Sequence, residues 1–435
     1  MKKSLNILLI EPRNEMVLTG GGATIPLWPC VLSAITPKQH RVDFIHSSFE
    51  EVTANKLKRY DLIGVSSRTE TANHAYAIGD MCRALKIPCI IGGIHAFVAP
   101  EETKQHCDSI VLGEAEYIWG TVLEDARNGK LEKSYKSDYI NPDDIPIPDF
   151  AVARKYKYKI ENVLETVRGC PFNCSFCSAT KFSGNKYRYK PVSNILKEID
   201  SWKNKNQLSV IVDLNITSNF DKAKELFHAL ISKKLCWWGY ASANIAKDDE
   251  ILELMSKSGC FYLGIGFESL SKETLKEMNK SVNIKINYKE FIEKLHYYNI
   301  DIFANFIFGM DTDTTDVFEE TTEFVLENNI DFPVFQILVP YPGTKVFSDF
   351  EKEGRLLTKN WSKYTRTDVV FQPKNMTKQE LINGLFGAYE KVYSKRNMRK
   401  RFYSKWRGVK KSIYNMIITS HFKKQFLAIK KNYML

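Results

Sequence analysis

The sequence predicts an α/β protein with a doubly wound parallel sheet, then a partial (β/α)6 barrel of the TIM type and a helical C-terminal extension. Short apolar, strand-like segments alternate with amphipathic helical segments along most of the chain, an order typical of parallel sheets. Residues 141–149 interrupt this alternation with three prolines, which fit neither a helix nor a central strand. We therefore expect a first domain at 1–140, a linker at 141–155, a barrel at 156–350 and an extension at 351–435.

Five strands are expected in the first domain, because each is a short apolar run bounded by polar or glycine-containing turns. Ligands of doubly wound sheets bind outside the carboxyl ends of the strands, so the loops that follow these strands form the candidate binding surface. The expected strands are residues 7–10, 42–45, 61–67, 88–95 and 109–116, and residues 72–86 are expected to be helical.

Six strands are expected in the barrel. Active sites of such barrels lie at the carboxyl ends of the strands, so polar residues at those ends are candidates. Glu268, for example, could hold a ribose hydroxyl or an ammonium group, and its structural alternative is a helix-capping acid. The expected strands are residues 163–167, 210–215, 237–241, 261–268, 302–309 and 333–339.

Three cysteines follow the first barrel strand. Cys170, Cys174 and Cys177 have three and then two residues between them, and the intervening proline and asparagine favour a loop over one face of a helix. Three thiolates on a short loop suit an iron–sulfur cluster that keeps one iron free for a small molecule. Zinc would need a fourth ligand nearby, whereas Cys236 and His228 are distant in sequence. A disulfide fits poorly with an odd number of cysteines.

The segment 168–177, Arg-Gly-Cys-Pro-Phe-Asn-Cys-Ser-Phe-Cys, resembles the radical SAM superfamily, in which an aromatic residue precedes the last cysteine of CxxxCxxC. Gly184 and Arg188 continue the pattern of one subgroup. The resemblance implies a 4Fe-4S cluster on the three cysteines that chelates S-adenosylmethionine (SAM) and, once reduced, cleaves it to a 5′-deoxyadenosyl radical. A low-potential donor such as flavodoxin or ferredoxin would reduce it. The SAM contacts that it implies are Phe176, Asp213, Asn215, Glu268, Ser269, Asn305 and Gly309.

One element departs from the superfamily pattern. Residues 305–309 stand in the place of its GxIxG element, but Asn305 replaces the first glycine. Thr312 stands where an acid is expected, three residues beyond Gly309. A main-chain contact to adenine is still expected here.

The loops of the first domain resemble the Rossmann-like cobalamin-binding domain that precedes many radical SAM domains. The DxHxxG motif, which supplies an axial histidine to cobalt, is absent, and His95 has a structural alternative as a hydrogen-bonding group. Two glycines at a strand end let a bulky ligand approach the backbone. A domain that only docks onto the barrel is the alternative. The cobalamin contacts that the resemblance implies are Ser66, Gly92, Gly93, His95, Gly113 and Glu114.

The C-terminal region has two parts. Up to about residue 395 it resembles the extension of cobalamin-type radical SAM proteins that include hopanoid C-methylases, and Thr377 with Glu380 predicts a helix-starting capping box. Residues 391–435 hold fourteen Lys or Arg and no acid, so without them the net charge of +11 becomes −3. Basic residues interleaved with large apolar ones predict peripheral membrane contact. A helix packed on the barrel is the alternative, and no nucleic-acid partner is expected.

Composition indicates the cellular compartment, and the motifs together indicate the class of function. No apolar stretch reaches transmembrane length, and nine cysteines without a disulfide framework fit a reducing cytoplasm. We expect a cytoplasmic enzyme that transfers a methyl group, with cobalamin, to an unactivated carbon of a lipid or small metabolite. A radical SAM rearrangement or cyclisation without methyl transfer is the first alternative. A non-catalytic iron–sulfur redox sensor is the second.

Overall fold

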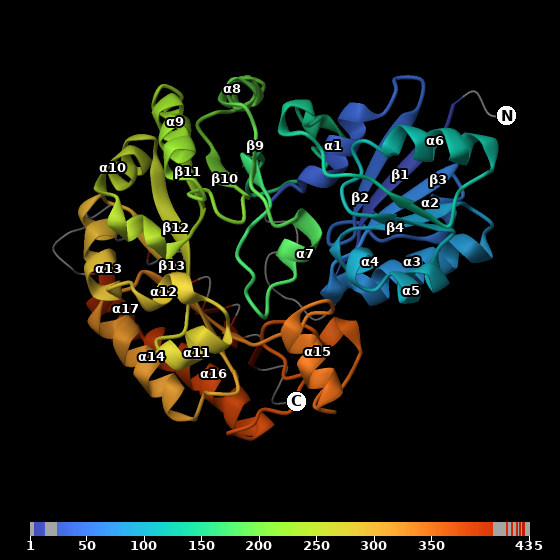
Figure 1. Cartoon of the computed structure of the whole chain (residues 1–435). Helices are drawn as coiled ribbons and strands as arrows, with labels where there is room; N and C mark the ends of the chain where they lie inside the picture. Colours follow the sequence, from blue (N-terminus) through green and yellow to red (C-terminus); the bar gives the residue numbers. More distant parts are fainter. Residues whose placement is uncertain are drawn as a thin grey trace.

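The computed structural model describes residues 4–13 and 24–402 and isolated positions between 415 and 430. Within these residues it contains two parallel sheets of six strands each (Figure 1), which confirms the expected α/β class. The first sheet has the strand order β2-β1-β3-β4-β5-β6 and forms the N-terminal unit. Its strands are β1 (Asn6–Glu11), β2 (Arg41–His46), β3 (Leu62–Ser66), β4 (Cys89–Gly92), β5 (Ser109–Leu112) and β6 (Ser134–Lys136).

Both faces of the N-terminal sheet are covered, because its strands are apolar on both sides. Ile7 and Leu9 of β1 are buried together with residues of α1 (Leu27–Ile35) and α6 (Trp119–Asn128). Leu8 and Ile10 alternate with them and are buried with residues of α3 (Ala72–Ala84) on the other face. The five expected strands and the helix are present, whereas β6 was not predicted.

The second sheet is the partial barrel, in the order β7-β10-β11-β12-β13-β14. The expected first strand, residues 163–167, is divided: β7 ends at Leu164, and Val167 begins β8, which pairs with β9 in a separate antiparallel ribbon. The strands are β7 (Asn162–Leu164), β10 (Leu208–Ile211), β11 (Cys236–Ala241), β12 (Cys260–Glu268), β13 (Asp301–Phe308) and β14 (Phe332–Ile337), with the ribbon of β8 (Val167–Arg168) and β9 (Arg188–Tyr189). The helices that follow the barrel strands are α8 (Val192–Asp200), α9 (Phe220–Ile231), α10 (Asp249–Lys257), α11 (Lys272–Glu277), α12 (Ser281–Ile284), α13 (Tyr288–Tyr297) and α14 (Asp316–Glu327).

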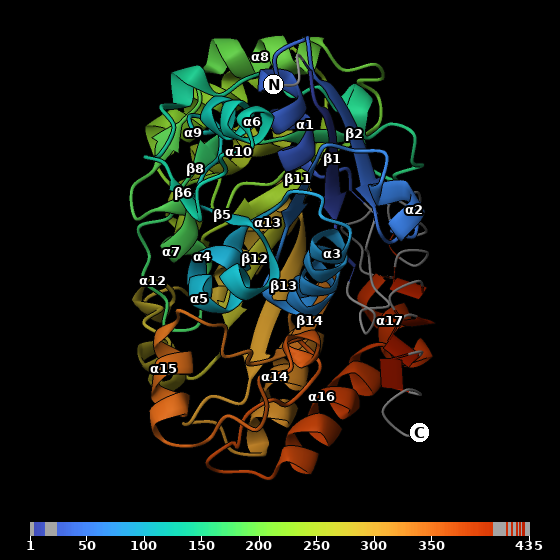
Figure 2. The same ribbon diagram turned by 90° about the vertical axis from the view of Figure 1, so that its right-hand side faces the viewer.

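The two units lie side by side, with β9 and α7 (Ala179–Ser183) between them in Figure 1. In Figure 2 the helices of the N-terminal unit lie in front of the barrel strands. A parallel bridge joins Thr24 to Ile160, and the Asn73 amide donates to Asn360 at 2.7 Å. The start of the barrel and the C-terminal extension are therefore both tied to the N-terminal unit.

α15 (Lys345–Lys352) spans the expected boundary between the barrel and the C-terminal extension, and the extension contains α16 (Lys378–Val392) and α17 (Lys395–Phe402). The predicted capping box is confirmed, since the Thr377 hydroxyl accepts from the Glu380 backbone N–H at 3.2 Å and the Glu380 carboxylate accepts from the Thr377 N–H at 2.7 Å. α16 packs along α14 and β14 at the side of the barrel, at the end opposite α8 (Figure 2).

Most of the basic tail, for which membrane contact is expected, lies outside the described residues. Of the tail positions that are described, Asn415 is buried and donates to Asp301 of β13 at 2.7 Å. The Phe426 ring stacks on Tyr389 of α16, with 4.3 Å between ring centroids. These contacts are those of a segment packed on the barrel. No helix among the described residues is long and apolar enough to cross a membrane.

Candidate functional site

The cysteine loop leaves the ribbon at Gly169. Any other residue at this position would force the neighbouring backbone to move. Gly169 has φ +86°, and a Cβ atom there would lie 2.0 Å from the Lys186 carbonyl oxygen. The Cys170 backbone N–H then donates to the Gly184 carbonyl at 3.0 Å. This turn presents all three cysteines in half-buried positions beside the barrel mouth.

The middle of the loop is held by two neighbouring segments. The Ser175 N–H donates to the Met278 carbonyl at 3.0 Å, and the Ser175 carbonyl accepts from the Val346 N–H at 3.1 Å. The Asn279 amide donates to the Asn173 carbonyl at 2.7 Å. The loop is therefore fixed from both sides before any ligand binds.

A part-buried ion pair lies next to the cysteines. Lys280 and Glu268 are 3.1 Å apart, and Glu268 ends β12 with φ +62°, a left-handed conformation that a non-glycine residue seldom adopts. Burial raises the pKa of the Cys174 thiol to about 11, although the Lys280 charge lowers it. Desolvation opposes the charge of Lys280, but Glu268 and Cys174 raise its pKa overall. A permanent cation thus stands beside the thiols.

These residues fit an anionic iron–sulfur cluster. Three thiols converge enough that the charges of Cys170 and Cys177 raise the pKa of Cys174, and Lys280 would stabilise the negative charge of thiolate ligands. No three Cys, His, Asp or Glu residues in the described part of the chain are close enough to hold a single metal ion. In a 4Fe-4S cluster each cysteine binds a different iron, so the three sulfurs need not converge on one point. The prediction that these cysteines hold a cluster therefore stays a prediction.

The remaining SAM candidates lie along the barrel mouth, mostly in structural hydrogen bonds. The Ser269 hydroxyl accepts from the Ser271 N–H at 3.1 Å, and the Asn305 carbonyl oxygen accepts from Gln336 at 3.1 Å. Phe176 packs against the barrel core. The Gly309 N–H donates to Asp313 at 2.9 Å, so the acid expected at position 312 stands one residue later.

Asp213 connects the cysteine ribbon to the second barrel strand. Its carboxylate accepts from the backbone N–H groups of Thr166 and Val167 at 2.7 and 3.1 Å, and also from the Thr166 hydroxyl. Burial raises its pKa to about 7, even though these donors lower it. The same bonds explain why the expected strand 163–167 breaks, since they turn the chain between β7 and β8.

A cavity of about 360 Å³ lies between the carboxyl ends of the two sheets. Five of the six residues predicted to contact cobalamin line it: Ser66, Gly92, Gly93, Gly113 and Glu114. Asp213 lines it from the barrel side, and the apolar side chains of Val212 and Leu214 are 40% and 42% exposed there. Its inner wall is apolar and includes Leu9, Trp28, Ile90, Val111 and Trp119.

His95 is the exception, and the structure corrects its predicted place. β4 ends at Gly92, Gly93 has φ +91°, and His95 lies in the short helix α4 (Ile94–Val98), away from the cavity lining. Its ring nitrogens lie 2.9 Å from the Tyr76 hydroxyl and 3.3 Å from the Thr69 hydroxyl. Burial lowers the pKa of His95 to about 4, so a neutral ring is held in the interior.

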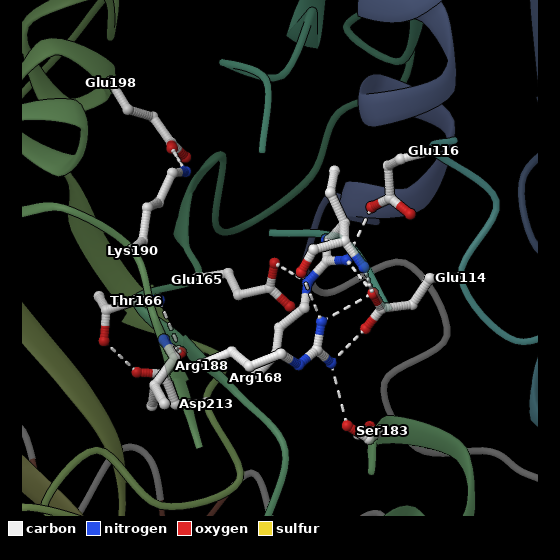
Figure 3. Close-up of polar contacts among 12 residues, drawn as sticks. Glu114, Glu116, Glu165, Thr166, Arg168, Ser183, Arg188, Lys190, Glu198 and Asp213 are labelled. Carbon is white, nitrogen blue, oxygen red and sulfur yellow. Dashed lines mark hydrogen bonds and ion pairs between the residues drawn. The ribbon is translucent and has the colours of Figure 1, made fainter. Parts of the chain in front are cut away.

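A network of ion pairs joins the cavity wall to the cysteine ribbon (Figure 3). The Arg188 guanidinium donates to both oxygens of Glu114, at 2.5 and 2.8 Å. Arg168, next to the cysteine loop, lies 2.8 Å from both Glu116 and Glu165 and 3.4 Å from Glu114. Desolvation opposes the charge of Arg168, but the three acids together raise its pKa.

Sequence reasoning missed the partners in this network and also missed Lys280. Arg168 and Arg188 stand within the superfamily pattern, so their presence was noted, but nothing in the sequence relates them to Glu114 and Glu116. Lys280 follows Glu268 by twelve residues and carries no motif. Tyr187, which accepts from the Asn215 amide at 3.2 Å, was missed in the same way.

Comparisons with known proteins identify one matching family, a relative of similar length and two solved structures of similar fold. The Radical SAM superfamily matches residues 164–325. Bacteriochlorophyllide d C-12(1)-methyltransferase of Chlorobaculum tepidum is 32% identical over 412 residues, which cover 92% of this chain and 89% of that protein. The chain also resembles two solved structures in fold. The cobalamin-dependent SAM radical enzyme OxsB with aqua-cobalamin bound has a TM-score of 0.70 at 14% identity, over 98% of this chain and 72% of that chain. The radical SAM methyltransferase TsrM of Kitasatospora setae, with cobalamin and a [4Fe-4S] cluster bound, has a TM-score of 0.64 at 15% identity, over 80% and 78% of the two chains.

Proposed function

This chain belongs to the radical SAM superfamily, whose enzymes use a 4Fe-4S cluster and SAM, and we propose that it is a cobalamin-dependent C-methyltransferase. The observation that carries the proposal is the cavity between the two sheets. It is bounded by the glycine loops of the N-terminal unit and by Arg168 and Gly169, which directly precede the first cysteine. A second cofactor in this cavity would lie next to the cluster site.

The lining of the cavity fits a large, mostly apolar ring system. Gly92 and Gly93 leave the backbone at the end of β4 open to close approach, and Gly113 does the same after β5. Val212 and Leu214 offer exposed apolar side chains on the barrel side. The apolar inner wall would cover a further part of the ligand. OxsB and TsrM, which share this fold, hold cobalamin in their structures.

The residues of this chain would position and shield the reacting groups. When bound, the cluster and SAM would supply the adenosyl radical, and cobalamin would supply the methyl group. Cys170, Cys174 and Cys177 would hold the cluster, with the Lys280 charge beside them. Arg168 would keep the cysteine ribbon against the cavity through its contacts with Glu114 and Glu116, and the apolar wall would exclude water from the radical.

The name of one relative suggests which substrate class to test first. The relative at 32% identity is named for methyl transfer to bacteriochlorophyllide d, so a tetrapyrrole is the first substrate to test. Lipids and other small metabolites are the wider class. A low-potential protein such as flavodoxin or ferredoxin is proposed as the electron donor.

The test is a product analysis. The anaerobically reconstituted enzyme would be given SAM, cobalamin, reductant and bacteriochlorophyllide d, and S-adenosylhomocysteine, 5′-deoxyadenosine and methylated product would be measured by mass spectrometry. We expect all three from wild type and from Cys236→Ala, an exposed cysteine outside the loop, and none from Cys174→Ala. 5′-Deoxyadenosine without S-adenosylhomocysteine would indicate a rearrangement or cyclisation instead. Absence of both S-adenosylhomocysteine and 5′-deoxyadenosine with bacteriochlorophyllide d, and also with the lipids and small metabolites tested after it, would favour a redox sensor.

A further inference from the structure

The cavity between the two sheets has more acidic than basic groups in its lining. Among the described residues that line it, the charged ones are Glu114, Glu116, Glu165, Arg168 and Asp213. Arg188 neutralises Glu114 through its two hydrogen bonds. Arg168 lies 2.8 Å from both Glu116 and Glu165, so within this lining one guanidinium faces two carboxylates. One negative charge is left over.

The other two acids of the lining are already occupied by donors. Both oxygens of Glu114 accept from Arg188, and one of them also accepts from the Ile140 N–H at 2.8 Å. Both oxygens of Asp213 accept from Thr166, one from its backbone N–H and one from its hydroxyl. Neither Glu114 nor Asp213 therefore needs a donor from a ligand.

Glu116 and Glu165 each keep one oxygen for a ligand. Arg168 contacts Oε1 of Glu116 and donates to Oε2 of Glu165, so the two side chains meet at one guanidinium (Figure 3). Within the described residues, no hydrogen bond or ion pair reaches the second oxygen of either carboxylate. The Glu116 side chain is only 8% exposed. An acceptor so far removed from water costs free energy unless a donor reaches it.

A corrinoid supplies such donors, because the rim of the corrin ring carries amide side chains. An amide NH₂ can donate to a carboxylate oxygen, in a charge-assisted hydrogen bond that is stronger than one between neutral groups. A carboxylate at the same place on the ring has no hydrogen to donate and would be repelled by Glu116 and Glu165. Bacteriochlorophyllide d carries a carboxylate, so the same charge separates a corrinoid cofactor from a tetrapyrrole acid.

We propose that Glu116 and Glu165, held in place by Arg168, accept hydrogen bonds from the amide side chains of the corrinoid and select against rings that carry a carboxylate there. Both are binding residues for the rim of the ring. The inference rests on the cobalamin site of the proposed function and is independent of methyl transfer and of the substrate.

The chain offers a matched control in Glu124 of α6, in the same unit as Glu116. Its side chain is 66% exposed and lies 3.6 Å from Arg127. Glu124→Gln makes the same change of charge and shape at a distance from the cavity lining. Glu116→Gln and Glu165→Gln each keep an oxygen for Arg168 and offer the cavity an NH₂ group, which can donate to a carboxylate.

The experiment measures binding, without SAM or substrate. The full chain with its cluster reconstituted is dialysed to equilibrium against hydroxocobalamin or against its b-, d- and e-monocarboxylic acids, in each of which one propionamide is hydrolysed. Bound corrinoid is determined as cobalt, and iron content and far-UV circular dichroism report folding. We expect at least one acid to bind wild type and Glu124→Gln about tenfold or more weakly than hydroxocobalamin. For the same acid, this ratio should fall toward one in Glu116→Gln, in Glu165→Gln or in both.

Two results would overturn the inference alone. One is equal affinity of wild type for hydroxocobalamin and all three acids, which is decided whether or not a variant folds. The other is a ratio that stays at the wild-type value in both cavity variants at equal iron content. Failure of wild type to bind hydroxocobalamin would instead overturn the proposed cobalamin site, and this inference with it.

Discussion

Arg188 donates two hydrogen bonds to Glu114, at 2.5 and 2.8 Å, and this fork joins the cavity wall of the N-terminal unit to the ribbon that carries the cysteines. The Glu114 carboxylate also accepts from the Ile140 N–H at 2.8 Å. Two-point contacts of this kind fix direction as well as distance. The loop around Glu114 and the cysteine loop should therefore move together.

Breaking this fork should destabilise the folded chain. The side chains of Glu114 and Arg188 are only 7% and 15% exposed, and removal of one partner of a buried pair costs about 3–5 kcal/mol. We expect Glu114→Gln and Arg188→Gln each to lower the free energy of unfolding by an amount of this order. The double variant should lose less than the sum of the two, as measured by denaturant unfolding.

The exposed pair of Lys345 and Asp349 is the control for that cycle. Its side chains are 72% and 40% exposed, so Lys345→Gln should change stability by less than about 1 kcal/mol. Strict additivity of the two variants at Glu114 and Arg188 would show that the fork carries no coupling.

Asp213 should make stability depend on pH. Its pKa is about 7 in the folded chain, against an ordinary value of 3.8, so the folded state binds more protons than the unfolded state between these values. The contribution of Asp213 to the free energy of unfolding is therefore fully present below pH 3.8. It declines as pH rises toward 7, at up to about 1.4 kcal/mol per pH unit.

Asp213→Asn imitates the protonated carboxyl and should remove this dependence. We expect the variant and wild type to be equally stable near pH 4 and the variant to be more stable at pH 8, by thermal or denaturant unfolding. Asp138→Asn, at an exposed position, controls for the loss of one charge. A difference between wild type and Asp213→Asn that is constant over this range would contradict the assignment.

His95 should matter for stability and not for corrinoid binding. His95→Ala removes a buried partner of the Tyr76 hydroxyl, at a cost of about 1–3 kcal/mol, and should leave the absorption spectrum of bound corrinoid unchanged. Tyr76→Phe removes the same hydrogen bond from the other side and should give a smaller loss. A corrinoid spectrum that changes in His95→Ala but not in Tyr76→Phe would indicate that His95 is a ligand of the cobalt.

The sheets could be predicted because alternation of strands and helices is a local pattern. The same rule predicts that the loops carrying Ser66, Gly92 and Gly113 lie at one edge of the sheet, because the carboxyl ends of parallel strands meet there. Their assignment to cobalamin came from the family resemblance. The direction of His95 could not be predicted in this way. It depends on where β4 stops and on the positive φ of Gly93, which set the path of the chain within two residues.

Contacts between residues that are distant in sequence could not be predicted either. Glu114 and Arg188 are 74 positions apart, and each on its own is an ordinary charged residue. The break between β7 and β8 has the same origin, because it depends on Asp213 accepting from Thr166 and Val167. Such contacts appear only when the two units and the ribbon are folded together.

The most direct test fills the cavity at Gly92. A Cβ there would lie 3.6 Å from the nearest atom, an ordinary contact with Val111, so Gly92→Leu should fold while its side chain occupies the cavity. Gly120→Leu is the control, since nothing lies within 4 Å of its Cβ position and it is exposed on α6.

The measurement is the corrinoid absorption retained after anaerobic loading with hydroxocobalamin and gel filtration, alongside iron content. We expect wild type and Gly120→Leu to retain corrinoid and Gly92→Leu to lose most of it at equal iron content. Retention of corrinoid by Gly92→Leu at the level of wild type, or none in wild type, would contradict a cobalamin site in this cavity.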